Sequence, residues 1–154
     1  MKKIAKLLSG ILVCASLVAC GAKGPALKEG LTVNDVVAKV EEKAPMQMPM
    51  ELDETTIKDL TTINLDDVEG YAIKKAMIMN SADITAVVKA KDGKVESVKE
   101  ALQKMLDTEK DNAYLPEQKD KVENAVLTEK GNYVILLINA DIPSAEAAIN
   151  ECFE

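Results

Sequence analysis

One unbroken run of apolar residues, Tyr133–Ile138, constrains the fold of this chain more than any other segment. A strand that is apolar at every position has no face suited to water, so we expect it inside a sheet that is covered on both faces. The preceding Gly131-Asn132 pair suits a tight hairpin to a partner strand over residues 125–130. The run therefore predicts a domain built around a buried sheet.

The spacing of apolar residues elsewhere predicts a second hairpin and several helices. Strands are expected over residues 71–79 and 84–90, joined by Asn80 and Ser81, after an acidic turn over residues 64–70. Helices are expected over residues 32–43, after a cap at Asp53, after Gly93, over residues 116–124 and from Pro143 onward. This order predicts an α+β domain, a mainly antiparallel four-stranded sheet with helices packed on it.

The first 19 residues are typical of a secretion signal. Three lysines within residues 1–6 precede the apolar segment Leu7–Ala19, which is too short to span a bilayer as a permanent helix. The segment ends in Leu17-Val18-Ala19-Cys20, which looks like the lipobox at which a lipoprotein cysteine receives diacylglycerol. The alternative is an ordinary secretory signal in which Cys20 has no role.

Lipidation of Cys20 would place the protein outside the membrane, anchored to the cell membrane through its diacylglycerol group. Two acyl chains give a stable anchor, whereas one chain alone binds reversibly. Cys20 with residues 21–30, which include three glycines and a proline, is expected to form a flexible tether. Residues 31–154 are expected to form a single domain.

The charge of the expected mature chain excludes some partners. Without residues 1–19 the chain has 16 Lys and 26 acidic residues, a net charge of about −10, and it has no Arg. Nucleic acid is therefore an unexpected partner, because its binding depends on basic side chains that displace counterions from phosphates. The sequence leaves the oligomeric state open.

A single cysteine, Cys152, remains after the signal and the lipidated residue, so no intramolecular disulfide is available. Its place beside Ile149 on the apolar side of the last predicted helix indicates a buried, inert thiol. The alternative is a reactive thiol or an intermolecular disulfide.

The chain contains no histidine, which excludes Ser-His-Asp and Cys-His catalysis and imidazole zinc sites. Carboxylate groups such as Asp53-Glu54 are expected as helix caps and solvated faces, with no cofactor. The stretch Asp66-Asp67-Val68-Glu69-Gly70 could be interpreted as a calcium loop. It lacks the alternating ligands and distal glutamate of an EF-hand, so we expect a polar turn.

The segment Met46-Gln47-Met48-Pro49-Met50 is the most unusual local feature. Thioether sulfurs select Cu(I), and alternate methionines in an extended segment could bring three sulfurs to one ion. Methionine is also a flexible filler of apolar cores, so the same residues could simply pack across the sheet. Met46, Met48 and Met50 are therefore candidate metal ligands with a structural alternative.

Several short motifs together resemble one family. They are the lipobox, the Pro/Met segment leading into Met50–Asp53, the acidic turn, and the stretches Val87–Gly93, Tyr114–Gln118 and Lys130–Val134. Over about residues 33–153 the chain resembles the bacterial lipoprotein family labelled domain of unknown function 4358. The resemblance implies a surface-anchored domain and carries no activity or functional residues. The family's usual Tyr-Gly before the acidic turn is here Thr62-Ile63, which puts in doubt any role for an aromatic residue there.

The sequence thus favours a nonenzymatic lipoprotein that acts as a binding or interaction module, with an envelope protein as its partner. The alternative is a carrier for a metal, Cu(I) at the methionines, or for a small solute. A deep pocket would favour the carrier, whereas a broad exposed apolar patch would favour a protein partner.

Overall fold

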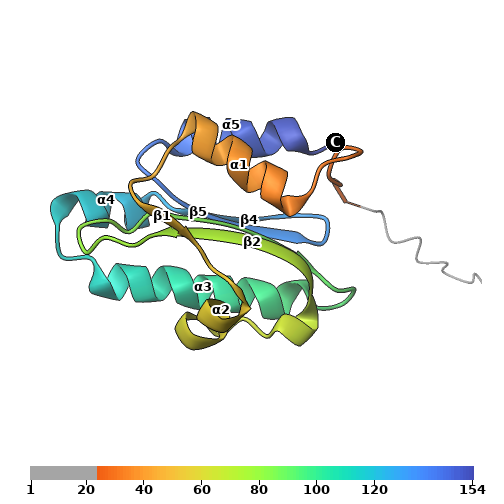
Figure 1. Ribbon diagram of the computed structural model, residues 1–154, viewed down its shortest axis with the longest axis horizontal. Coiled ribbons are helices and arrows are strands. Elements are labelled where there is room, and N and C mark those ends of the chain that lie inside the picture. Colours follow the sequence, from red (N-terminus) through yellow and green to blue (C-terminus); the bar gives the residue numbers. More distant parts are fainter. Residues whose placement is uncertain (1–23) are drawn as a thin grey trace, which may run out of the picture.

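The computed structural model describes residues 24–154, which form a sheet between two layers of helices (Figure 1). The predicted signal peptide 1–19, Cys20 and residues 21–23 of the predicted tether lie outside the described residues. In the described part of the chain, no helix has the length and apolar character needed to cross a membrane.

The sheet is antiparallel and has five strands, in the order β1-β2-β3-β5-β4. The strands are β1 Pro49–Glu51, β2 Val68–Ala76, β3 Ile84–Ala90, β4 Val126–Lys130 and β5 Tyr133–Ile138. The α+β class is confirmed, but the expected count of four strands is wrong. β1 was missed because it has only three residues and begins with a proline, so it shows no alternating pattern.

The helices lie on both faces of this sheet, and their order agrees with the sequence analysis. They are α1 Val33–Lys43, α2 Glu54–Leu60, α3 Val95–Asn112, α4 Pro116–Glu123 and α5 Ile142–Cys152, with a 3-10 turn η1 over Leu65–Asp67. Helices α1 and α5 cover one face, whereas α2 and α3 cover the other (Figure 1). Thr32 and Asp35 form the predicted capping box of α1, and Asp53 caps α2.

Strand β2 lies three residues earlier in the chain than predicted. It covers Val68–Ala76 instead of residues 71–79, so it includes part of the expected acidic turn. A register irregularity between Val68 and Gly70 lets the strand start in that turn. At its other end, Met77, Ile78 and Met79 leave the sheet for the loop before β3.

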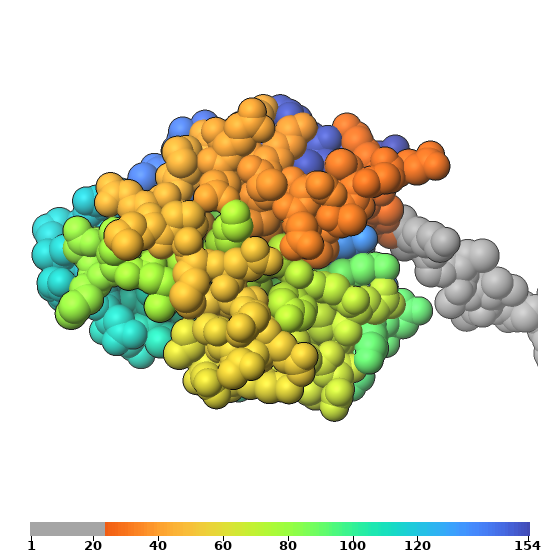
Figure 2. Space-filling model, viewed as in Figure 1, coloured from red at the N-terminus to blue at the C-terminus, as the bar shows by residue number. Residues whose placement is uncertain are grey.

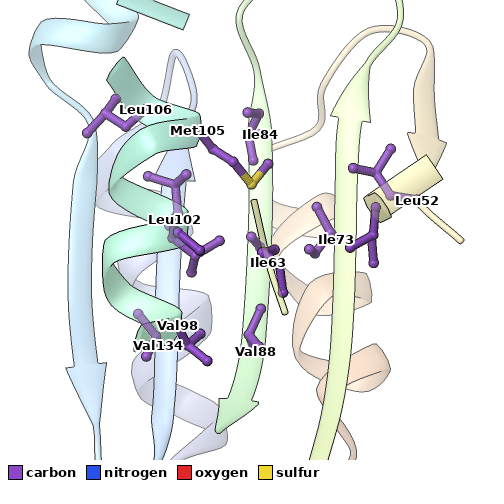
Figure 3. Close-up of a cluster of buried hydrophobic side chains, with 14 of the residues drawn as sticks. Leu52, Ile63, Ile73, Ile84, Val88, Val98, Leu102, Met105, Leu106 and Val134 are labelled. Carbon is purple, nitrogen blue, oxygen red and sulfur yellow. The ribbon is translucent and has the colours of Figure 1, made fainter. Parts of the chain in front are cut away.

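The apolar run of β5 is buried on both sides, as its sequence predicts. Val134, Leu136 and Ile138 contact the core on the α3 side, and the residues between them contact the core on the α1 and α5 side. Figure 3 shows the side chains of α3, among them Leu102 and Met105, meeting those of the strands. Each fully buried side chain of this size contributes about 1.5–3 kcal/mol relative to an exposed one.

The described part of the expected tether is attached to the domain. Leu27 forms an antiparallel bridge with Phe153, and the backbones of Ala26 and Glu154 exchange hydrogen bonds of 3.1 and 3.0 Å. Gly24 lies so close to the β4–β5 turn that a Cβ on it would come within 2.8 Å of the Gly131 Cα. Residues 24–30 therefore lie against the chain's C-terminal end, beside which Figure 1 shows them.

Thr85 in β3 provides a test of the core. Its side chain is 1% exposed, and its hydroxyl is the buried side-chain oxygen of the described residues without a hydrogen-bond partner. Because an unsatisfied buried hydroxyl costs free energy, we expect Thr85→Val to raise the free energy of unfolding by about 1 kcal/mol. Urea denaturation would measure this, with Thr85→Ala as a control that instead loses packing. A loss of stability in the valine variant would contradict the prediction.

Glu151 in α5 joins this helix to α1. Its carboxylate contacts Nζ of Lys43 at 2.5 Å and Nζ of Lys39 at 3.0 Å, and these two contacts lower the pKa of Glu151 from 4.5 to about 2. The contribution of these two contacts to the stability of the folded state is therefore fully present above pH 4.5 and is lost as the pH falls toward 2.

We accordingly expect the free energy of unfolding to fall more steeply between those pH values in the wild type than in Glu151→Gln. Urea denaturation across this pH range would measure it, with Glu146→Gln on the same helix as the matched control. Parallel pH profiles for wild type and Glu151→Gln would show that the contact does not stabilise the fold.

Candidate functional site

The three methionines predicted as metal ligands have three different surroundings. Met46 is buried at 7% exposure, Met48 is 68% exposed, and Met50 is partly buried against the core on the α3 side. Met48 also has a positive φ of 46°, which turns the chain just before β1. The three side chains therefore differ in exposure, and the metal-ligand assignment stays a prediction.

Exposed apolar side chains instead gather at one end of the domain, which we call the methionine end and define as Met48, Met77, Met79 and Tyr114. Their exposed fractions are 68%, 48%, 89% and 60%. In Figure 2 the amber, green and teal segments that carry them lie together, opposite the end where Gly24 begins. These four side chains are therefore candidates for contact with another molecule.

Hydrogen bonds connect the three segments of the methionine end. The backbone N–H of Met77 donates to the carbonyl of Met48 at 3.2 Å. Gln118 in α4 donates from Nε2 to the Met79 carbonyl at 3.0 Å, and its Oε1 accepts from the backbone N–H of Tyr114 and Leu115. Gln118 thus holds the Met79 loop and the start of α4 together.

A buried ion pair supports this end from inside. Lys121 in α4 contacts Asp83 at 3.0 Å, and their side chains are 8% and 4% exposed. The hydroxyl of Ser81 also donates to the Asp83 carboxylate. Removing one partner of such a pair leaves a buried charge uncompensated, so the pair fixes the position of α4 against the β2–β3 loop.

A groove beside the methionine end consists of two open hollows, of about 440 and 310 Å³. The first lies between α2 and α3, with Leu52, Leu60 and Met105 in its lining, and the second lies under Met77 and Met79. Lys75, Glu109 and Asn112 line both hollows. The groove is therefore continuous with the methionine end.

Lys75 and Glu109 form an ion pair where the two hollows meet, with side chains 23% and 14% exposed. They are 34 residues apart in the sequence, on β2 and α3. No sequence pattern pointed to them, because neither residue belongs to a local motif. The pair offers both a cation and an anion to a polar group placed in the groove.

The acidic turn uses its carboxylates within the fold. Asp67 is 8% exposed, contacts Lys94 at 2.9 Å and accepts a hydrogen bond from Ser97 at 2.9 Å. These two contacts lower the pKa of Asp67. In residues 24–154, no three His, Cys, Asp or Glu side chains are grouped to hold a metal ion. The turn fastens the start of α3 to the start of β2.

The other carboxylate pair singled out in the sequence begins a helix. Asp53 accepts hydrogen bonds from the backbone N–H and the hydroxyl of Thr56, which lower the pKa of Asp53. Glu54 pairs with Lys58 one turn later, at 2.6 Å. Both carboxylates therefore have local partners on α2.

The motifs at the other end of the domain also have structural roles. Gly131 has a φ of 57° and begins the two-residue turn between β4 and β5. Asn132 donates from Nδ2 to Asp92 at 2.8 Å, and Gly93 takes a φ of 76° just before α3. These residues form turns, and the geometry assigns them no chemistry.

Cys152 is 1% exposed, in agreement with the expectation of a buried thiol, and burial raises the pKa of this thiol. We expect a thiol reagent such as a disulfide dye to label Cys152 at least tenfold more slowly in the native protein than in the urea-unfolded protein, because little thiolate is accessible. A variant with Cys14→Ser and Cys20→Ser leaves Cys152 as the one thiol and isolates this signal. Rapid labelling of the native variant would contradict the buried assignment.

The model of one family, described as a domain of unknown function (DUF4358), matches residues 42–139. The match covers more than half of the chain and includes the methionine end and the groove, whereas it leaves out α5 and nearly all of α1. No curated protein and no solved structure matches the chain.

Proposed function

The chain belongs to the DUF4358 family, and we propose that it is a lipid-anchored, extracytoplasmic interaction module that binds an apolar segment of another envelope protein at its methionine end. The observation that carries this proposal is the gathering of four exposed apolar side chains at one end. Methionine suits such a role because its flexible, polarizable side chain adapts to different apolar partners.

The surroundings of the methionine end support a docking role. Gln118 and the Lys121–Asp83 pair hold its backbone, so binding would order side chains without ordering loops. The adjoining groove extends the apolar surface. The exposed Leu60 is part of the lining of its first hollow. A partner segment placed there would contact apolar residues at Met77 and Met79 and a charged pair at Lys75 and Glu109.

A nonenzymatic role fits the chemistry of the chain. It has no histidine to activate a nucleophile. The carboxylates of Asp53, Asp67 and Asp83 each have partners that serve the fold. Anchoring at Cys20 and a position outside the membrane are supported by the basic and apolar N-terminal residues and by the lipobox.

The second candidate function is a carrier for a small solute. The larger hollow, at about 440 Å³, is within the size range of small-molecule sites. It is open to solvent on the side of the domain, however, and exposed apolar side chains adjoin it. A Cu(I) carrier would use the sulfurs of Met46, Met48 and Met50, whose side chains differ in exposure.

The test is crosslinking at single positions in intact cells. A photoreactive benzophenone amino acid is placed at Met79, at Tyr114, or at the control Asn34, which is exposed on α1. We expect one product of defined mass from Met79 and Tyr114 and none from Asn34. Adding Met48→Lys and Met77→Lys should reduce its yield about tenfold, the effect of losing about 1.4 kcal/mol of binding free energy.

Two outcomes would contradict the proposal. Identical products from all three positions would show unspecific proximity instead of docking at the methionine end. Absence of any product, together with a stoichiometric metal or small molecule in the purified protein, would favour the carrier.

A further inference from the structure

The described start of the chain is fastened to one end of the domain, which we call the attachment end and define as residues 24–30, Gly131 and Glu154. Lys28 adds to the backbone pairing there, because its N–H donates to the Cys152 carbonyl at 2.9 Å. Its Nζ donates to the Glu151 carbonyl at 2.8 Å. The chain is therefore held to the domain from Gly24 onward and not from Leu31.

This attachment limits how far the domain can stand from a lipid on Cys20. Only four peptide units separate Cys20 from Gly24, and fully extended they reach about 13–14 Å. A link over the whole of residues 20–30 would have reached roughly 33–36 Å. A lipid on Cys20 would therefore hold the attachment end within about 13–14 Å.

The methionine end lies at the opposite end of the molecule from the attachment end (Figures 1 and 2). Strand β3 connects the two ends, since its Lys89 pairs with Tyr133 beside the β4–β5 turn and its Ile84 pairs with Ile138. Helix α3 runs between the same two ends, from Val95 to Asn112, and its 18 residues span about 27 Å.

From these lengths we infer that the attachment end of the domain rests on the lipid surface and that the methionine end points away from it. This orientation rests on the proposed lipidation of Cys20. With a link of about 13–14 Å and a domain of about 27 Å, the methionine end can reach the bilayer only if the domain tips over on its side. Its partner segment would thus lie in the aqueous part of the envelope, clear of the headgroups.

The chain contains no tryptophan, so one introduced residue reports on one position. Glu29→Trp places the probe at the attachment end and Asn80→Trp places it in the β2–β3 turn beside the methionine end, both at exposed positions. Each lipidated variant is reconstituted into phosphatidylcholine vesicles that carry a nitroxide on the headgroup. This quencher acts over a short distance.

We expect the fluorescence of Glu29→Trp to be quenched at least threefold more than that of Asn80→Trp. A spacer of 20 Gly and Ser residues inserted between Lys23 and Gly24 should remove most of this difference, since the domain could then turn freely. Co-flotation with the vesicles measures the anchoring separately, and the control is a Cys20→Ser chain that lacks residues 1–19.

The outcomes distinguish the orientation from the anchoring. Co-flotation with equal quenching at both positions, or with stronger quenching of Asn80→Trp, would overturn the orientation and leave the anchoring intact. Absence of co-flotation would overturn the lipid anchor and the orientation together.

Discussion

The burial of β3 and β5 on both faces is the constraint on which the rest of the structure depends. These neighbouring strands pair along their whole length, from Ile84 with Ile138 to Lys89 with Tyr133. Because most of their side chains on both sides are apolar, neither face of the sheet can be left to water. Helices α2 and α3 are therefore needed on one face, and α1 and α5 on the other.

This arrangement gives the domain two distinct ends. Strands β2, β3, β4 and β5 run between them, so the loops that join β2 to β3 and β4 to β5 lie at opposite ends. One end collects turns made by Gly131 and Gly93 together with both described termini of the chain. The other end collects loops held by Gln118 and Lys121, and there the apolar side chains that leave the sheet remain exposed. The proposed docking surface and its orientation both follow from this separation.

Much of the fold could be predicted because its signals are local. The extent of β3, the cap at Asp53 and the start of α4 at Pro116 each depend on neighbouring residues. The residues of the candidate site give no such signal. Gln118, which lies 39 residues after Met79, connects Met79 to Tyr114. Lys75 pairs with Glu109, which lies 34 residues later in the chain. Contacts of this range depend on how helices pack on the sheet.

The sequence by itself determined the periodicity of the elements, the absence of histidine chemistry and the two-sided burial of β5, because these depend on residue type and spacing. Only the tertiary structure decided that the edge strand Pro49–Glu51 joins the sheet. It also decided that Met46, Met48 and Met50 differ in exposure, and that Ala26 and Lys28 pair with the C-terminal end. The physical reason is the same in each case, since backbone pairing and burial depend on partners that are distant in the chain.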